Sequence, residues 1–349
     1  INEAYNDIQC LNCSATSGTP ITVNVGAPTT GIDFALVLGG EITGTVVDGG
    51  TALPLSGVSV RLMTASGANA VTATTDGTGR YRLRGLPAGA YYVGTANSLG
   101  YINEFYDDAP CVLTCGSTGG TPVTVSAGAV AGSVNFALTA GGRISGTITD
   151  ATTGLPLSGV TVTFYSPSGG SIRSPGNFSA TVSTNSLGQY TSGAGLVPGT
   201  YYALTSNSLG YINEAYNDLS CLACSATSGT AIPVTLGTTT GGVDFALTPG
   251  AEIAGTVTAA GTGLPIPGVS VRLFTTSGSN PLTATTDAAG VYRLRGLPTG
   301  TYYVGTSNSL GYINEFYNDA QCVLSCGATG GTSIDVTAGV VTSSINFAL

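Results

Sequence analysis

The sequence predicts an all-β protein built as a tandem array of antiparallel β-sandwich domains. The first observation is a repeat, because variants of INEAYND begin at Ile1, Ile102, Ile212 and Ile313. The second is that the intervals contain short segments of alternating apolar and polar residues, separated by Gly, Pro, Asn and Asp. The third is that no segment shows the pattern of an amphipathic helix.

The repeat also predicts the domain boundaries. The INEAY copies carry Cys-x2-Cys and the INEFY copies carry Cys-x3-Cys, so the full period is 211 residues and covers two alternating domains. We expect sandwich domains at residues 39–138, 139–248 and 249–349. Residues 1–38 match only the last third of a unit, which predicts the C-terminal part of an incomplete sandwich. Either upstream sequence in a longer array, which we favour, or strand donation from another chain completes it.

Individual strands can be placed within one unit. The third predicted strand, residues 79–85, puts Tyr81 and Leu83 on one face and Arg82 and Arg84 on the other, so the first face should be core. The complete set of predicted strands is 41–48, 57–64, 79–85, 90–97, 121–127 and 133–138.

Composition excludes several classes of protein. Only 8% of residues are charged, the net charge is -9, and the chain has neither lysine nor histidine. The negative balance argues against nucleic acid as a partner, because phosphate binding needs clustered Lys or Arg. No apolar run reaches the length of a transmembrane helix. Without histidine there is no Ser or Cys triad and no His-ligated zinc, so we expect a non-enzymatic protein.

The eight cysteines form close pairs, which we interpret as local structural disulfides in an oxidising compartment. The pairs are Cys10/Cys13, Cys111/Cys115, Cys221/Cys224 and Cys322/Cys326. A zinc site would need two pairs close in sequence or a histidine, and a redox Cys-x-x-Cys usually opens a helix. The cysteines therefore favour an extracellular or cell-surface location.

The pattern GxIxGTV…GLPLSGVxV…TTDxxGxYxLxGLPxGxYYV…FAL resembles the carboxypeptidase regulatory-like domain. That family has a transthyretin-like, Ig-like fold of seven strands and is related to the Cna-B repeats of bacterial surface proteins. The resemblance covers residues 39–138, 140–247 and 249–349, and it implies a stalk, spacer or enzyme appendage. The Cna-B relationship would imply a Lys–Asn isopeptide crosslink, which a chain without lysine cannot form. The cysteines in the INE loops also go beyond the family pattern.

Each INE loop gathers oxygen-bearing side chains that suit a hard cation such as Ca²⁺. The candidate ligands are Asn103, Glu104, Asp107 and Asp108, then Asn213, Glu214, Asn217 and Asp218, and then Asn314, Glu315, Asn318 and Asp319. Alternatively, the Asn and Asp side chains bond to the backbone of a turn, and the Glu caps it or faces solvent. No Ca²⁺ loop with ligands at alternate positions and a central glycine is present.

Three other groups of residues raise expectations. The aromatics Tyr101, Phe105 and Tyr106 either fill the core beneath the loop or form a platform for sugar or a partner. The arginines of the INEFY domains either pair with acidic loops of the other domain type or form a solvated face. Sequons at Asn12 and Asn177 predict glycosylation, which would solubilise a chain of so little charge.

Together these observations predict an extracellular filament or cell-surface stalk of disulfide-stapled sandwiches, whose partners are other copies of itself. One alternative is an adhesin that binds sugar or a host surface through the aromatic and acidic loops. Another is an accessory region of a secreted hydrolase. Exposure of the loops would favour the adhesin, and their burial at domain junctions would favour the structural role.

Overall fold

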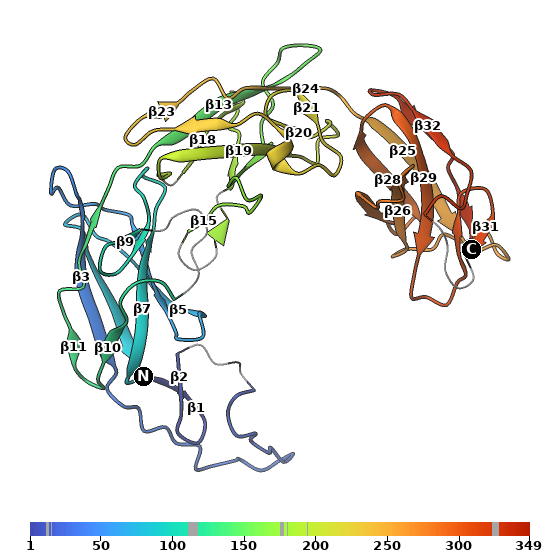
Figure 1. Ribbon diagram of the computed structural model, residues 1–349. Helices are drawn as coiled ribbons and strands as arrows, with labels where there is room; N and C mark the ends of the chain where they lie inside the picture. Colours follow the sequence, from blue (N-terminus) through green and yellow to red (C-terminus); the bar gives the residue numbers. More distant parts are fainter. Residues whose placement is uncertain are drawn as a thin grey trace.

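The computed structural model contains three β-sandwiches that follow one another along the chain in an arc (Figure 1). It describes residues 1–11, 14, 16–110, 118–174, 178–179, 181–193, 195–322 and 328–349. Six predicted sites lie outside the described residues: Asn12, Cys13, Cys111, Cys115, Asn177 and Cys326. The helical content of the described part is a single 3₁₀ turn, η1 (Ala226–Ser228).

The first sandwich consists of two sheets. One has the order β5-β4-β7-β8-β9 with β10 also paired to β7, and the other has β3 between β11 and β12, with β6 also paired to β3. The strands are β3 (Gly40–Asp48), β4 (Ser59–Met63), β5 (Asn69–Thr74), β6 (Arg80–Leu86), β7 (Gly89–Ala96), β8 (Glu104–Phe105), β9 (Ala109–Pro110), β10 (Val123–Val125), β11 (Val130–Ala131) and β12 (Phe136–Leu138).

The second and third sandwiches repeat this topology. The second contains β13 (Arg143–Asp150), β14 (Thr161–Tyr165), β17 (Thr181–Ser183), β18 (Gln189–Thr191), β19 (Gly199–Ser206), β20 (Glu214–Ala215), β21 (Leu219–Ser220), β22 (Ile232–Val234), β23 (Thr239–Thr240) and β24 (Phe245–Leu247), plus a hairpin of β15 (Arg173–Ser174) and β16 (Phe178–Ser179). The third contains β25 (Ala251–Thr258), β26 (Ser270–Thr275), β27 (Leu282–Thr285), β28 (Val291–Leu297), β29 (Gly300–Ser307), β30 (Asn314–Phe316), β31 (Ala320–Cys322), β32 (Ile334–Val336), β33 (Val341–Thr342) and β34 (Phe347–Ala348).

Each sandwich has its own hydrophobic core, formed by the inward faces of its two sheets. The predicted alternation in β6 is confirmed: Tyr81 and Leu83 are buried, whereas Arg82 and Arg84 are exposed. The buried Tyr81 hydroxyl donates a hydrogen bond to the carbonyl of Val134, and the equivalent tyrosines of the other two sandwiches make the same bond. The predicted all-β tandem sandwich is therefore the observed fold.

One detail of the pairing differs from the prediction. Strand β12 runs parallel to β3, as β24 does to β13 and β34 does to β25, although most other pairs are antiparallel. The chain leaves one sheet after β10 and crosses to the other sheet before β12. A crossing connection of this kind permits a parallel pair, which a hairpin cannot form.

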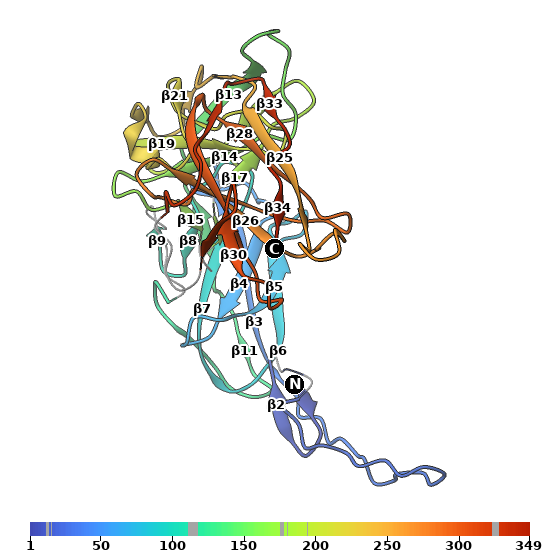
Figure 2. The same ribbon diagram turned by 90° about the vertical axis from the view of Figure 1, so that its right-hand side faces the viewer.

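The first 38 residues form no sandwich. Their regular structure is a two-stranded hairpin of β1 (Asn2–Ala4) and β2 (Ile8–Cys10), and the segment projects from the end of the first sandwich (Figure 2). Several large apolar side chains of this segment are exposed, including Val23 and Phe34. Among the helices of the described residues, none is long and apolar enough to cross a membrane.

Candidate functional site: the loop at each domain junction

The INE motif lies in a loop that follows the same strand in all three sandwiches. We call residues 97–110, 207–221 and 308–322 the junction loops, because the first two of them contact the next sandwich. Each begins at an asparagine directly after β7, β19 or β29 and contains the short hairpin β8–β9, β20–β21 or β30–β31. The loop is therefore placed by a long central strand of its own sandwich.

The first asparagine of each loop organises its conformation. The Asn97 side-chain amide donates to Tyr101 O at 3.0 Å and to Asn103 Oδ1 at 2.6 Å, and its Oδ1 accepts from the Leu99 and Tyr101 N–H groups. Asn207 and Asn308 make the same four hydrogen bonds. This asparagine was not among the site residues predicted from the sequence. The repeated segment NSLGYIN, which begins at it in all three sandwiches, is the sequence feature that could have indicated it.

This hydrogen bond also bears on the calcium hypothesis. The side-chain Oδ1 atoms of Asn103, Asn213 and Asn314, which would be the calcium ligands, each accept a hydrogen bond from the first asparagine of their loop. Asp107 accepts one from the Thr121 hydroxyl at 2.8 Å. Among the described residues, no three His, Cys, Asp or Glu side chains gather where they could share a metal ion.

The acidic turn of the loop has a conformational reason. Asp107 and Asp108 have φ of 74° and 54°, and Asn318 and Asp319 have φ of 72° and 58°. Asn and Asp tolerate this left-handed region better than other residues with a Cβ, which is why they are favoured in tight hairpin turns. The left-handed backbone of the turn is therefore a conformational reason for these Asn and Asp residues in the first and third loops.

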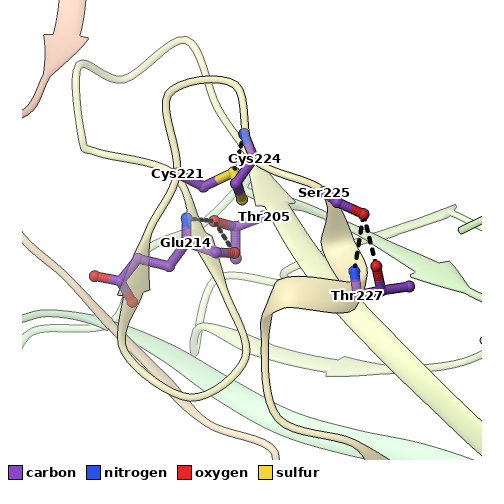
Figure 3. Close-up of a disulfide and its surroundings, with 6 residues drawn as sticks. All are labelled: Thr205, Glu214, Cys221, Cys224, Ser225 and Thr227. Atoms are coloured by element: carbon purple, nitrogen blue, oxygen red, sulfur yellow. Dashed lines mark hydrogen bonds between the residues drawn. A yellow bond between two sulfur atoms is a disulfide. The ribbon is translucent and has the colours of Figure 1, made fainter.

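The glutamate of each loop is buried, in contrast to the expectation that it caps a turn or faces solvent. Glu104, Glu214 and Glu315 are each less than a tenth exposed. In the second sandwich the Thr205 hydroxyl accepts from the Glu214 N–H at 2.8 Å and donates to its carbonyl at 3.3 Å (Figure 3). Thr95 and Thr306 hold Glu104 and Glu315 in the same way.

The buried carboxyl groups are only partly satisfied. Ala348 of β34 donates its N–H to Glu315 Oε1 at 3.2 Å, whereas one oxygen of Glu104 and one of Glu214 have no hydrogen-bond partner. Burial raises the pKa of Glu104 and of Glu214 to about 7, and the negative charges of Asp108 and Asp218 contribute to the same rise in pKa. These carboxyl groups can therefore take up a proton near neutral pH.

One predicted disulfide is observed in full. Cys221 and Cys224 are bonded, and the Cys224 N–H donates to Cys221 Sγ at 3.2 Å (Figure 3). Ser225 follows directly and caps η1 by accepting from the Thr227 N–H. Cys322 is also disulfide-bonded, and Cys10 lies at the end of β2. The bridge in the second loop closes the chain immediately after the hairpin that holds Glu214.

The aromatic residues of the loop point into the protein. Phe105 is buried against Met63, and Tyr106 packs edge-on against Phe136 at 6.3 Å between ring centroids. The Tyr101 hydroxyl donates to Asp48 Oδ2 at 2.6 Å, and the Tyr211 hydroxyl donates to Asp150 Oδ2 at 2.7 Å. Burial of Phe105 leaves no aromatic platform at that position for a sugar ring.

The outer side of the loop contacts the next sandwich. At the first junction, Gly100 O accepts from the Gly141 N–H at 2.9 Å and Tyr101 O accepts from the Gly195 N–H at 2.9 Å. The Arg143 side chain also donates to Leu99 O. At the second junction, Gly210 O accepts from the Gly250 N–H at 2.9 Å. The same loop therefore joins consecutive sandwiches twice in this chain.

The arginines pair within their own sandwich. Glu41 lies 3.6 Å from Arg82 and 3.5 Å from Arg84, and Glu252 pairs with Arg293 and Arg295 in the third sandwich. These arginines stay mostly exposed, so each pair contributes little to stability. In the second sandwich, Arg143 occupies the position of the glutamate. Pairing of these arginines with acidic loops of a neighbouring chain stays a prediction.

Comparison with known proteins identifies the domain type. The sequence model of the carboxypeptidase regulatory-like domain matches residues 41–139 and 252–349, which together make up more than half of the chain. Chitinase ChiA of Flavobacterium johnsoniae is 35% identical over 155 residues, which cover 42% of this chain and 8% of the chitinase. The chain thus spans less than a tenth of that relative.

Solved structures with a similar arrangement are more distant. The TIE protein of Bacillus anthracis has 15% identity and a TM-score of 0.26, over 88% of this chain and 50% of that one. A streptococcal ancillary pilin has 12% identity and a TM-score of 0.29, over 88% and 98%. BcpA, the major pilin subunit of Bacillus cereus, has 13% identity and a TM-score of 0.21, over 88% and 98%. Values this low carry no argument about assembly.

Proposed function

We propose that this chain, which belongs to the carboxypeptidase regulatory-like domain family, is a non-enzymatic structural protein of an extracellular filament or cell-surface stalk. The observation that supports this function is the repeated junction. At both junctions, carbonyl oxygens of the same loop accept hydrogen bonds from backbone N–H groups of the next sandwich or of the segment that leads into it. An array needs one contact repeated many times, whereas catalysis needs a single site.

The junction supports the role of a stiff spacer. Backbone hydrogen bonds at Gly100 and Tyr101 fix the next sandwich at two points, and the asparagine within the loop fixes the loop itself. In the second loop, Glu214 is buried in its own sandwich, and the Cys221–Cys224 disulfide closes the chain directly after the hairpin that holds it. Low charge suits lateral packing between copies, because few charged groups would have to be desolvated.

Electron microscopy of the purified chain tests the proposal. We expect extended particles of uniform curvature that associate into long fibres, and isolated flexible beads at all concentrations would contradict the filament. Gly195→Ala should loosen the first junction, because a Cβ at this position would lie 2.4 Å from Gly100 O. Gly77→Ala is the matched control, since a Cβ there has no neighbour within 4 Å.

A second candidate function is an accessory region of a secreted polysaccharide hydrolase. It is favoured by the 35% identity to part of a chitinase. If it holds, the chain should sediment with insoluble chitin and be released by soluble chitin fragments. Failure to sediment at protein concentrations that saturate a known chitin-binding domain would remove this candidate and leave the structural role unaffected.

A further inference from the structure

A leucine in the disulfide turn at the end of the second junction loop contacts the following sandwich. Leu222 lies between Cys221 and Cys224, which are bonded to each other. It is partly buried and packs against the hydrophobic core of the third sandwich. Among the described residues, the partly buried apolar side chains that pack against the core of the second sandwich are Val182, Tyr211 and Tyr216. The turn is therefore part of the second sandwich along the chain, whereas its leucine packs against the third.

The same contact occurs at the other INEAY copy. Leu11 directly follows Cys10, as Leu222 directly follows Cys221, and the two leucines lie one full 211-residue period apart. Leu11 is partly buried and packs against the core of the first sandwich. Both receiving sandwiches, the first and the third, are of the type whose loops carry INEFY. The contact is therefore a repeated feature of this pairing of domain types.

The turn that carries Leu222 is held at its base. The Cys221 N–H donates to Asn213 O at 2.7 Å, and the Cys224 N–H donates to Cys221 Sγ at 3.2 Å (Figure 3). A bridge between residues three positions apart also restricts the backbone of the two residues between them. Little conformational entropy is therefore left to lose when Leu222 packs against the next core.

The core of the third sandwich begins at the linker that joins it to the loop. Ala251 is completely buried and is part of that core. The preceding residue, Gly250, donates its N–H to Gly210 O of the loop at 2.9 Å. The third sandwich is thus joined to the second by a backbone hydrogen bond in the linker and by the apolar contact of Leu222.

The first junction has a different set of contacts. Arg143 of the second sandwich donates to Leu99 O, and the Gly195 N–H donates to Tyr101 O. In the third sandwich, Glu252 takes the place of Arg143 and pairs with arginines of its own sandwich. Among the described residues, no partly buried apolar side chain of the first sandwich packs against the second core. The first junction can therefore serve as a control within the same molecule.

We propose that the turn Cys221–Cys224 is an anchor for the next sandwich: Leu222 docks on the core of the third sandwich, and the disulfide positions Leu222 for this contact. The bridge thereby stabilises the junction between the two sandwiches rather than the fold of the second one. The partner surface is the core of an INEFY-type sandwich. The inference rests on the proposed role as a spacer and names the contact that fixes one of its junctions.

Leu222→Ala in the full chain tests the anchor. Hydrogen exchange is followed at the Gly250 and Ile212 N–H groups, whose hydrogen bonds lie at the second junction. We expect exchange at both groups to accelerate about tenfold, as loss of a partly buried leucine contact should allow the junction to open more often. The core of the second sandwich should keep its protection, because Leu222 packs against the other core.

Two controls accompany this variant. The N–H groups of Gly141 and Ile102 make the corresponding hydrogen bonds at the first junction, and they should exchange as in the unaltered chain. Ala223→Ser changes the exposed neighbour of Leu222 in the same turn and should leave both junctions as they are.

Replacing both cysteines tests the role of the bridge. Cys221→Ser with Cys224→Ser should accelerate exchange at Gly250 as much as Leu222→Ala does. Adding Leu222→Ala to this variant should have almost no further effect, because the bridge acts through the leucine. Exchange at Tyr216, whose N–H bonds within the second sandwich, should not change.

Three results would overturn the proposal. In the first, Leu222→Ala leaves exchange at Gly250 unchanged. In the second, it accelerates exchange equally at both junctions, so the leucine has no specific role at the second one. In the third, the effects of the leucine and cysteine substitutions add in full, so the bridge acts independently of Leu222. Because exchange is measured in single chains, a failure to form fibres would contradict the proposed function and not this inference.

Discussion

The junction loops of the second and third sandwiches share an inner layer and differ in an outer one. The inner layer is the same in both: Asn207 bonds to Asn213 at 2.7 Å and Asn308 to Asn314 at 2.6 Å. In the outer layer, Tyr211 bonds to Asp150, whereas Ala259 occupies the corresponding position opposite Tyr312.

Burial follows the same division. Ile212 is 4% exposed, and its N–H donates to Thr248 in the connection to the third sandwich, whereas Ile313 is 55% exposed. Glu214 and Glu315 are buried alike. The inner layer is therefore built alike in both loops, whereas the outer layer differs. The Tyr211–Asp150 bond lies within the second sandwich and has no counterpart in the third, where residue 259 is alanine, and Ile212 is covered at the connection to the third sandwich. Substitutions in the inner layer should consequently act strongly in both loops, and those in the outer layer weakly and in one loop only.

Replacing the buried glutamate should change how stability depends on pH. The folded pKa of Glu214 is about 7, above its ordinary value, so the folded state holds the proton more tightly than the unfolded state does. The stability gained from this proton is fully present below the ordinary carboxyl pKa and is lost as pH rises to about 7. The loss should be roughly 2–4 kcal/mol for the second sandwich.

Glu214→Gln should remove this pH dependence, and hydrogen exchange in β19 at pH 5 and pH 8 measures it. Glu315→Gln is the matched variant. Burial also raises the pKa of Glu315, but its bond from Ala348 opposes that rise, so the same sign with a smaller size is expected. A pH dependence that Glu214→Gln leaves intact would place its origin elsewhere.

The hypothesis that the second junction loop binds Ca²⁺ can be tested at the same glutamate, Glu214. If Glu214 and Asp218 help to hold Ca²⁺, the ion should stabilise the second sandwich at pH 8, by about 2.7 kcal/mol at a hundredfold excess over its Kd. Chelator should then lower the melting temperature, and Glu214→Gln should abolish the difference. An identical melting curve with and without chelator, and no metal by elemental analysis, would exclude Ca²⁺.

Removing the first asparagine should cost the same in both loops, because it belongs to the inner layer. Asn207→Ala and Asn308→Ala each remove four hydrogen bonds, two to acceptor oxygens and two from backbone N–H groups, which should cost about 2 kcal/mol. Denaturation followed by hydrogen exchange in β19 and β29 measures each sandwich separately. Ser208→Ala, at an exposed neighbour, is the control. A cost confined to Asn207 would show that the two loops are not equivalent inside.

Part of this molecule could be predicted from residue types alone. The alternation of Tyr81 and Leu83 with Arg82 and Arg84 reports directly which face of a strand is buried. The close spacing of Cys221 and Cys224 predicted their bond. These features are local, so a short pattern contains all the information that decides them.

Other features depend on contacts between residues far apart along the chain. The Glu104 carboxyl group is buried because β12 lies against it. The local sequence around Glu104 does not show this, since β12 follows about thirty residues later. The partner of Glu41 lies about forty residues away in β6, and the parallel course of β12 results from a crossing between sheets. The role of Asn97 also could not be predicted from the INE motif, because its hydrogen bonds to Tyr101 and Asn103 form only when the loop folds back on itself.

Replacing Tyr211, the tyrosine of the outer layer, should have the smallest effect on local stability, and the effect should be confined to the second sandwich. Tyr211→Phe removes the bond to Asp150 and should accelerate exchange in β13 about fivefold, the amount expected for one hydrogen bond. Loss of this bond should also raise the pKa of Asp150, which the Tyr211 hydroxyl holds below its ordinary value. Tyr312→Phe has no such bond to lose and should leave β25 unchanged. If both substitutions act equally, the Tyr211–Asp150 bond does not account for the difference between the two loops, and the division into two layers fails.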